Sequence, residues 1–509
     1  MAQSSAVWRR IAAEAANHPD DVALRRCDHS GTVRYGQLDS QTGRIAADFA
    51  AASIGRRDRV LIVSDNGPQT YLGVLACART GVIAVMADGA LPPATIARFA
   101  EITTPSAVAI APGARLRAAD LPDSLRGLPL IDIGIGSGPA DSARVAGSED
   151  LPDSAADDPL AMIFTSGTTG EPKAVLLPNR TFYAIADILA AERLSWVDWE
   201  PGETTYSPLP ATHIGGLWWI LNCLMHGSVC VTGGEDTTSL LEILERHQVA
   251  TACLVPTLIT RLVAEQKATG ADLPQSLRLL GYGGSRAVAS DIDQVETAGV
   301  RTAQVYGLSE TGCTALCLPT GDGSIDRIAA SAVGRPYPGV QTRLDSAGTL
   351  WVNSPANMLG YWDNPEKTAE VLVDGWVNTG DLLEQHDDGY FYIRGRASEM
   401  IISGGVNVAP DEVDRIAERV PGVRQAACFE IPDPEFGALI GLAVVPTAEL
   451  DAKQIRRLKQ AIAARFRQES EPMARPARIC AVTEIPRTAS GKVIRAELAA
   501  AADGAPTGG

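Results

Sequence analysis

Short apolar runs alternate with amphipathic stretches through the first 110 residues of the chain. The run DRVLIVS at 58–64 predicts a buried strand, TYLGVLACARTG at 70–81 predicts a helix, and VIAVMA at 82–87 predicts the next strand. Strand, helix and strand at this spacing form a βαβ unit, whose right-handed crossover lays a helix over a parallel sheet. The same pattern returns at 240–262 and at 276–305. We therefore expect an α/β fold.

The pattern changes towards the C-terminus. From about residue 333 the strand-like runs become shorter, and beyond Arg396 a smaller α+β unit begins. Pro410 followed by Asp411 and Glu412 predicts the start of a helix, because proline suits the first helical position and acids suit the first turn. The expected division is a large N-terminal domain of βαβ-type sheets packed with helices, a hinge, a small α+β C-terminal lid domain and a disordered tail, at residues 1–395, 396–399, 400–503 and 504–509.

Length, charge and cysteine usage narrow the class of protein. The 509 residues are enough for two or three domains. A net charge of −17 would be repelled by nucleic acid and by an anionic membrane surface, so we expect neither as a partner. The nine cysteines form no CxxC pair, which favours reduced thiols. Because the N-terminus lacks a signal-peptide core and no run of 18 apolar residues occurs, we expect a cytoplasmic protein without a membrane span.

The sharpest motif is TSGTTGEPKAV at 165–175, directly after the apolar run AMIF. A strand that leads into hydroxyls and glycines is suited to surround phosphate oxygens, because glycines let backbone N–H groups approach and hydroxyls add further donors. The spacing differs from the Walker pattern GxxxxGK[ST]. The expected phosphate contacts are Thr165, Ser166, Gly167, Thr168, Thr169, Gly170 and the mobile cation of Lys173.

With this motif the chain resembles the adenylate-forming superfamily, which includes acyl-CoA synthetases, adenylation domains and luciferases. Further segments, in the order typical of that family, extend the resemblance over nearly the whole chain: GYGGSRA at 281–287, YGLSETG at 306–312, WVNTGDL at 376–382 and PRTASGKVIR at 486–495.

The resemblance implies a nucleotide site on the N-terminal domain. Glu310 would hold Mg²⁺, with Ser166 as a second metal contact, and Ser309 would contact the nucleotide phosphate where the family usually has Thr. Asp381 would accept hydrogen bonds from the two ribose hydroxyls, as carboxylates do in dinucleotide-binding folds. The other residues that the resemblance assigns to ATP or AMP are Gly283, Gly284, Ser285, Tyr306, Gly307 and Arg396.

The resemblance also implies a mobile lid. Lys492, within the sequence SGK, is the expected catalytic lysine. The expected hinge residue is Glu399, although the family usually has Asp there and Lys one position earlier, where this chain has Ser398. Gly404 and Gly405 resemble the loop that lines the coenzyme A tunnel.

The segment ATHIGGLWW at 211–219 resembles the acyl pocket of acyl-CoA synthetases. His213 is expected beside the substrate carboxylate as a catalytic residue, and Gly215, Gly216 and Trp218 are expected in the pocket, although core packing explains the tryptophan at least as well. The segment offers no acidic residue to pair with an amino group. A largely apolar acid is therefore expected rather than an α-amino acid.

The implied reaction has two steps. A carboxylate attacks the α-phosphorus of Mg-ATP to give acyl-AMP and pyrophosphate, and the acyl group then passes to a thiol. The first hypothesis is an acyl-CoA synthetase that uses ATP, Mg²⁺ and coenzyme A; the alternative is a stand-alone adenylation enzyme that loads a separate carrier protein. Whether the acid is fatty, aryl or polycyclic stays open. A catalytically dead nucleotide-binding homologue is disfavoured by the presence of Lys173, Glu310, Asp381, Arg396 and Lys492.

Overall fold

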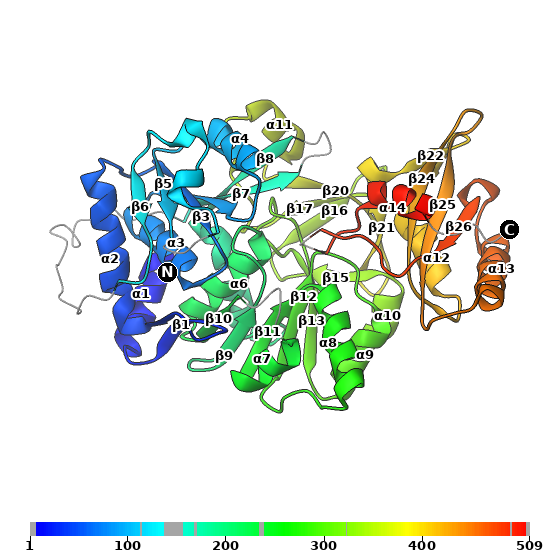
Figure 1. Cartoon of the computed structure of the whole chain (residues 1–509), viewed down its shortest axis with the longest axis horizontal. Helices are drawn as coiled ribbons and strands as arrows, with labels where there is room; N and C mark the ends of the chain where they lie inside the picture. The colour runs from blue at the N-terminus through cyan, green and yellow to red at the C-terminus, as the bar shows by residue number, and fades with distance from the viewer. Residues whose placement is uncertain are drawn as a thin grey trace.

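The computed structural model describes residues 7–111, 115–136, 156–166, 171–233, 239–321, 323–488 and 491–504. It has a large N-terminal body and a smaller C-terminal part, in a mixed α/β architecture (Figure 1). All but the first residue of the predicted tail lies outside the described residues.

One sheet of the body carries the predicted βαβ unit. Within the described residues it has seven strands, which are, in spatial order, β18 (Gly360–Tyr361), β8 (Pro172–Pro178), β7 (Pro159–Ser166), β4 (Ile83–Asp88), β3 (Arg59–Ser64), β5 (Ala107–Ile110) and β6 (Leu130–Asp132). The strands from β7 to β6 run parallel, whereas β8 returns antiparallel to β7. The strands predicted at 58–64 and 82–87 are confirmed as β3 and β4, and the helix between them is α3 (Pro68–Thr80).

A larger sheet forms the rest of the body. In the described residues it has fourteen strands, in the order β16 (Gln341–Leu344), β17 (Thr349–Asn353), β20 (Trp376–Gln385), β21 (Phe391–Arg396), β15 (Ala332–Pro336), β14 (Leu316–Pro319), β13 (Arg301–Tyr306), β12 (Leu279–Gly283), β11 (Val249–Leu254), β9 (Thr204–Ser207), β10 (Val229–Thr232), β1 (Val22–Arg26) and β2 (Thr32–Arg34), with β19 (Leu372–Val373) beside β20. Its middle strands, from β13 to β1, run parallel. Their carboxyl ends share one edge, which is where open α/β sheets place their ligands.

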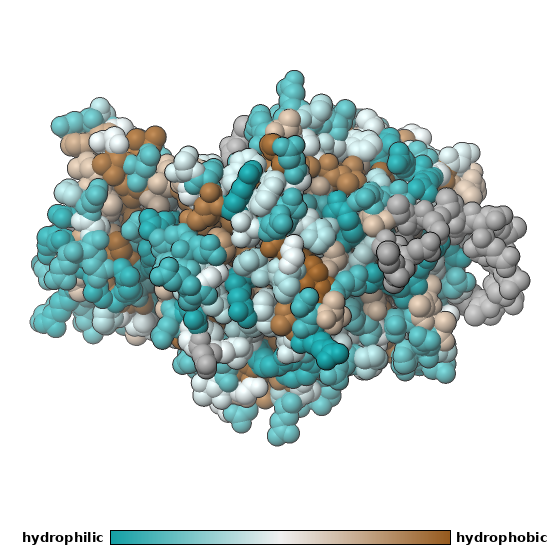
Figure 2. Space-filling view, turned by 180° about the vertical axis from the view of Figure 1, so that it is seen from behind, coloured by the Kyte–Doolittle hydropathy of each residue, from teal (hydrophilic) through white to brown (hydrophobic). Residues whose placement is uncertain are grey.

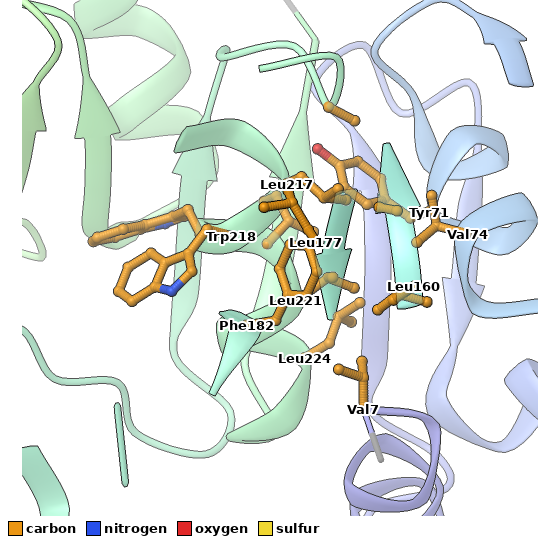
Figure 3. Close-up of a cluster of buried hydrophobic side chains, with 14 of the residues drawn as sticks. Val7, Tyr71, Val74, Leu160, Leu177, Phe182, Leu217, Trp218, Leu221 and Leu224 are labelled. Carbon is orange, nitrogen blue, oxygen red and sulfur yellow. The ribbon is translucent and has the colours of Figure 1, made fainter. Parts of the chain in front are cut away.

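Helices pack between and around the two sheets. They are α1 (Val7–Asn17), α2 (Tyr35–Ala51), α3, α4 (Pro93–Thr103), α5 (Ala184–Ala191), α6 (Ile214–Met225), α7 (Leu240–Arg246), α8 (Pro256–Thr269), α9 (Ala289–Thr297), α10 (Ser324–Ala329) and α11 (Pro365–Val371). Figure 3 shows Leu217, Leu221 and Leu224 of α6 meeting Leu160 of β7 and Leu177 of β8 in one buried cluster. Burial of these apolar side chains fixes α6 between the sheets.

The C-terminal part has its own core. Its elements are a short 3₁₀ turn, η4 (Ala397–Glu399), followed by β22 (Ile401–Ser403), β23 (Val406–Val408), α12 (Pro410–Glu418), β24 (Val423–Asp433), β25 (Gly437–Pro446), α13 (Ala452–Glu469), β26 (Arg478–Ala481) and α14 (Arg495–Gly504). The helix predicted to begin at Pro410 is confirmed as α12, and Val413 and Ile416 on its inner face pack with Leu442 and Phe466.

One face of the molecule is mainly polar. Figure 2 shows a face dominated by hydrophilic side chains, with hydrophobic ones only in small groups. Among the described residues, no helix is long and apolar enough to cross a membrane.

Candidate active site

Asp381 on β20 is the centre of a buried polar cluster beside the carboxyl end of β13 in the large sheet. The side chain of Tyr306 at the end of β13 donates its O–H to Oδ2 at 2.7 Å, and Arg396 at the end of β21 donates Nε–H to Oδ1 at 2.5 Å. Burial and then the Asp381 charge raise the pKa of Tyr306, so its hydroxyl stays a donor. Burial opposes the charge of Arg396, but the Asp381 carboxylate outweighs it and the pKa of Arg396 is raised. The cluster fixes one carboxylate whose oxygens keep lone pairs for further donors.

The end of β12 and the segment after it also lie close to the end of β13. A side chain at Gly283 would place its Cβ 2.4 Å from the carbonyl oxygen of Val305, so glycine is required there. Gly284 has a φ of +83°, which glycine adopts without strain. The hydroxyl of Ser285 is buried and has no hydrogen-bond partner among the described residues. Because a buried polar atom without a partner costs free energy, an orphan hydroxyl here suits a site that a polar ligand completes.

The phosphate motif begins as a strand and returns as one. Thr165 on β7 pairs with Lys173 on β8, so the lysine lies beside the strand that leads into the motif. The expected contacts Gly167, Thr168, Thr169 and Gly170 lie outside the described residues, and of Ser166 only the backbone is described, at the end of β7.

Glu310 follows β13 in a tight turn. Gly307 is needed there, because a Cβ would lie 2.3 Å from the carbonyl oxygen of Cys313. The backbone N–H of Gly312 donates to the carbonyl of Ser309 at 3.2 Å, which helps to close the turn. The Oε1 atom of Glu310 accepts a hydrogen bond of 2.8 Å from the hydroxyl of Tyr361.

The donor set fits magnesium rather than a metal held by protein alone. No group of three or more His, Cys, Asp or Glu side chains that could hold a metal exists among the described residues. Mg²⁺ is usually bound through one or two carboxylates together with substrate phosphates and water. Glu310, close to the phosphate motif, offers one such carboxylate.

Lys492 reaches this site from the C-terminal part. In Figure 1 the red segment before α14 runs back to the body, and a Cβ at Gly491 would lie 3.0 Å from the Ser285 Oγ. Burial and then Arg396 lower the pKa of Lys492, whereas Asp381, Glu310 and Glu399 act in the opposite direction. The lysine side chain is nevertheless accessible to solvent. The structure therefore brings Lys492 among charged groups that lie more than 90 residues away in sequence.

His213 lies at the N-terminus of α6. Burial lowers its pKa, and Lys492 lowers it further while Asp88 opposes that effect, so the imidazole is neutral at pH 7. Gly216 is required by close packing, because a Cβ would lie 2.3 Å from the carbonyl oxygen of Leu209, whereas at Gly215 the nearest contact would be an ordinary 3.5 Å.

The tryptophan pair of α6 belongs to the core. Trp218 is 2% exposed and lies 5.7 Å from Trp199, ring centroid to ring centroid. Figure 3 shows it at one side of the same cluster as Leu217. Trp219 donates its Nε1–H to Thr205 at 2.8 Å and packs against Gly281, where a Cβ would lie 2.9 Å from the ring.

Among the described residues, few polar contacts join the C-terminal part to the body. Arg286, in the segment after β12, forms an ion pair with Glu418 at the end of α12. Arg415 of α12 donates to the carbonyl of Ala330 at 3.4 Å. The expected hinge residue Glu399 lies in η4, with its Oε2 3.8 Å from Nε of Arg495.

Gly404 and Gly405 form the turn between β22 and β23. Their φ angles of +56° and +80° explain why two glycines occur there. The N–H of Gly404 donates to the carbonyl of Phe436 at 2.9 Å, and a Cβ at this position would lie 2.7 Å from Sδ of Met473. These contacts hold the turn against the C-terminal part itself.

Sequence reasoning did not single out Tyr361. It stands in MLGYW at 358–362, a segment without charged residues or repeated hydroxyls. Its hydroxyl contacts Glu310, and the ammonium of Lys173 lies 5.4 Å from the centre of its ring. No local pattern could have revealed either contact, because both join segments far apart in the chain.

Comparison with known families and proteins gives a consistent result. The model of the AMP-binding enzyme family matches residues 11–362, and that of the AMP-binding enzyme C-terminal domain matches residues 412–492. The chain is 63% identical to a medium/long-chain-fatty-acid–[acyl-carrier-protein] ligase, FadD10, of Mycobacterium tuberculosis (strain ATCC 25618 / H37Rv), over 98% of this chain and 96% of that one. It is 61% identical to a fatty acid–[acyl-carrier-protein] ligase, MmaC, of Mycobacterium marinum (strain ATCC BAA-535 / M), over 99% of each chain. Among solved structures, the amide bond synthetase McbA of Marinactinospora thermotolerans is similar at 25% identity with a TM-score of 0.79, over 97% of this chain and 99% of that one.

These relatives correct one expectation from the sequence. The two that exceed 60% identity are ligases to an acyl carrier protein, whereas a sulfoacetate–CoA ligase of Cupriavidus necator (strain ATCC 17699 / DSM 428 / KCTC 22496 / NCIMB 10442 / H16 / Stanier 337) is 30% identical. The first hypothesis, an acyl-CoA synthetase with coenzyme A as acceptor, is therefore wrong. The error has a chemical reason: coenzyme A and a carrier protein both present a pantetheine thiol, so residues beside the thiol do not tell one acceptor from the other.

Proposed function

The chain belongs to the family of AMP-binding enzymes, and we propose that it is an ATP-dependent ligase that loads a medium- or long-chain fatty acid onto a separate acyl carrier protein. The observation that carries this proposal is the identity, over nearly the whole chain, of 63% to a medium/long-chain-fatty-acid–[acyl-carrier-protein] ligase and of 61% to a fatty acid–[acyl-carrier-protein] ligase. The buried apolar side chains of α6 and the absence of an acidic residue from the segment 211–219 agree with an apolar substrate.

The nucleotide would be held mainly by the N-terminal body. Asp381 would accept hydrogen bonds from the ribose hydroxyls, since Tyr306 and Arg396 already fix its orientation. The orphan hydroxyl of Ser285 and the glycines before it would lie along the adenine base. Lys173 and the hydroxyl-rich turn before it would receive the pyrophosphate end.

Magnesium would bind at Glu310. When bound, the ion would draw negative charge from the phosphates of ATP and of the leaving pyrophosphate. The protein's own part would be to hold the Glu310 carboxylate in place, and the Tyr361 hydroxyl does so in the structure described.

Lys492 would act in the first step. An oxygen of the fatty acid carboxylate attacks the α-phosphorus, and the bond to the pyrophosphate oxygen breaks. Both reactants are anions, so a cation between them lowers the barrier by electrostatic stabilisation. The electrostatic influence of Asp381 and Glu310 on Lys492, and of Lys492 on His213, supports this role. The neutral His213 would hydrogen-bond the carboxylate without adding charge.

The second step needs a different occupant of the site. The thiol of the carrier protein loses its proton, its sulfur attacks the acyl carbon, and AMP leaves. A swing of the C-terminal part about the segment near Glu399 would remove Lys492 and bring the turn at Gly404 and Gly405 towards the thiol. Within the ranges that the structure describes, the polar contacts between the two parts are few, which supports such a movement.

A competition between acceptors tests the proposal. The protein is incubated with Mg-ATP, a series of saturated fatty acids, and equal concentrations of a pantetheinylated carrier protein and free coenzyme A. Intact-mass spectrometry should show acyl carrier protein for medium and long chains and little acyl-CoA. Preferential acyl-CoA formation, or pyrophosphate release without any thioester, would overturn the proposal.

A further inference from the structure

Tyr361 joins the two parts of the nucleotide site that come from different sheets. It ends β18 at the edge of the seven-stranded sheet, opposite Val175 of β8. Lys173 lies two residues before Val175, and therefore on the same face of β8. Glu310, by contrast, follows β13 of the fourteen-stranded sheet.

The hydroxyl and the ring of Tyr361 each contact a different residue of the proposed site. The hydroxyl donates to Oε1 of Glu310 at 2.8 Å. The ammonium of Lys173 lies over the face of the ring, 5.4 Å from its centre. The residue is 8% exposed. The hydroxyl must be the donor in this pair, because an ionised carboxylate can only accept hydrogen bonds.

The backbone around Tyr361 has little freedom. Its N–H donates to the hydroxyl of Thr368 at 2.9 Å, and the N–H of Trp362 donates to the carbonyl of Ala174 at 2.8 Å. On the other side, the N–H of Met358 donates to the carbonyl of Glu310 at 3.0 Å. The segment 358–362 thus contacts Glu310 through both backbone and side chain while it is fixed to the strand of Lys173.

We infer that Tyr361 is a positioning residue: it holds the Glu310 carboxylate and the Lys173 ammonium in a fixed relative position for the magnesium–phosphate end of ATP. This inference rests on the proposed function. Tyr361 acts through Glu310 and Lys173 and takes no part in the chemistry. One oxygen of Glu310 is occupied by the tyrosine hydroxyl, which turns the carboxylate and leaves its other oxygen for a cation.

Tyr361→Phe is the sharpest test, because it removes the hydroxyl and keeps the ring beside Lys173. ATP affinity is measured by isothermal titration calorimetry with Mg²⁺ and, separately, with EDTA. Loss of a hydrogen bond to a charged group predicts about a tenfold weaker binding of ATP with Mg²⁺. Binding in EDTA should change by less than about twofold, because Glu310 then has no ion to position.

The matched control is Tyr35→Phe. Tyr35 is also buried, and its hydroxyl donates to the carbonyls of Ser228 at 2.8 Å and Leu224 at 3.2 Å, neither of which is assigned to magnesium or phosphate. Both variants should lose thermal stability, but only Tyr361→Phe should lose Mg²⁺-dependent affinity. If Tyr361→Phe behaves like Tyr35→Phe, Tyr361 is a structural tyrosine and the inference fails.

A double variant separates the two routes of failure. In Glu310→Gln the carboxylate is neutral, so adding Tyr361→Phe should weaken ATP binding by far less than it does in the wild-type background. Equal effects in both backgrounds would overturn the coupling between the two residues. If the wild-type protein itself binds ATP no better with Mg²⁺ than with EDTA, the proposed function fails, and this inference fails with it.

Discussion

The Asp381 cluster and the Lys492 turn both present charge to the proposed nucleotide site, but they are held in opposite ways. Asp381 is 2% exposed and accepts hydrogen bonds from two side chains at the ends of other strands of the same sheet, Tyr306 on β13 and Arg396 on β21. The Lys492 side chain is accessible, and its turn is closed by local bonds, such as that from the Arg487 guanidinium to the carbonyl of Gly491 at 2.8 Å. The proposed contacts to the nucleotide therefore lie within the large sheet, whereas the proposed catalytic cation stands on the C-terminal part, which we propose swings away between the two steps.

The largest expected effect comes from removing the cation. Lys492→Ala should slow acyl-AMP formation by a factor of about 10² to 10³, the usual size for loss of one preorganised stabilising group. Transfer from supplied acyl-AMP to the carrier protein should change much less, because the lysine is then outside the site. ATP–pyrophosphate exchange and single-turnover transfer measure the two steps. Lys453→Ala on the exposed side of α13 serves as control. Equal losses in both steps would contradict the comparison.

A change in the fixed cluster should affect both steps. Asp381→Asn keeps the shape of the side chain but removes its charge, so it weakens the hydrogen bonds from Tyr306, Arg396 and the ribose. We expect a rise of about 10- to 100-fold in the KM for ATP, since hydrogen bonds to charged groups are stronger than neutral ones. Acyl-AMP should also bind less tightly in the transfer step, which distinguishes this variant from Lys492→Ala. A normal affinity for acyl-AMP would exclude Asp381 as the ribose ligand.

Sequence could reveal the groups but not their partners. The apolar runs predicted β3 and β4, and the start of α12, because local pattern and burial agree there. The residues expected in the nucleotide site were recognised by short motifs, yet the hydrogen bond between Tyr306 and Asp381 spans 75 residues and the contact between Tyr361 and Glu310 spans 51. Such contacts depend on how the strands are ordered in the sheets, which periodicity does not encode. The acceptor was missed because the shared pantetheine thiol leaves no distinguishing residue near it.

Loss of the ion pair between the N-terminal body and the C-terminal part should have a smaller effect on the rate. Arg286→Gln removes the ion pair with Glu418, which joins the segment after β12 to α12. Because both side chains are partly exposed, the pair contributes modestly, and we expect acyl-AMP formation to slow by about three- to tenfold. The KM for ATP should stay unchanged, since neither residue belongs to the Asp381 cluster.

Reversal of the pair is the matched control for this prediction. The double variant Arg286→Glu/Glu418→Arg should recover part of the rate if the ion pair itself holds Lys492 in place. Glu418 also accepts a hydrogen bond from the backbone of Ala426 at 3.0 Å, so recovery should be incomplete. A loss of ATP affinity in Arg286→Gln would instead assign the arginine to the nucleotide.

The smallest expected effect is a shift in pH dependence. Burial and then Arg396 lower the pKa of Lys492 below its ordinary value of 10.5, and only the charged form can stabilise the transition state. The kcat/KM of acyl-AMP formation should therefore fall on the alkaline side at a lower pH than an ordinary lysine would give. In kcat the fall should lie at higher pH, because the charge of bound ATP raises the lysine pKa again.

Lys492→Arg should be slower but lose this alkaline fall, because a guanidinium stays charged. Asp381→Asn should move the fall to still lower pH, because Asp381 raises the pKa of Lys492. If wild type and Lys492→Arg show the same alkaline fall in rate, a group other than Lys492 controls it. The charge of Lys492 is then not the one that the Asp381 cluster influences in the reaction.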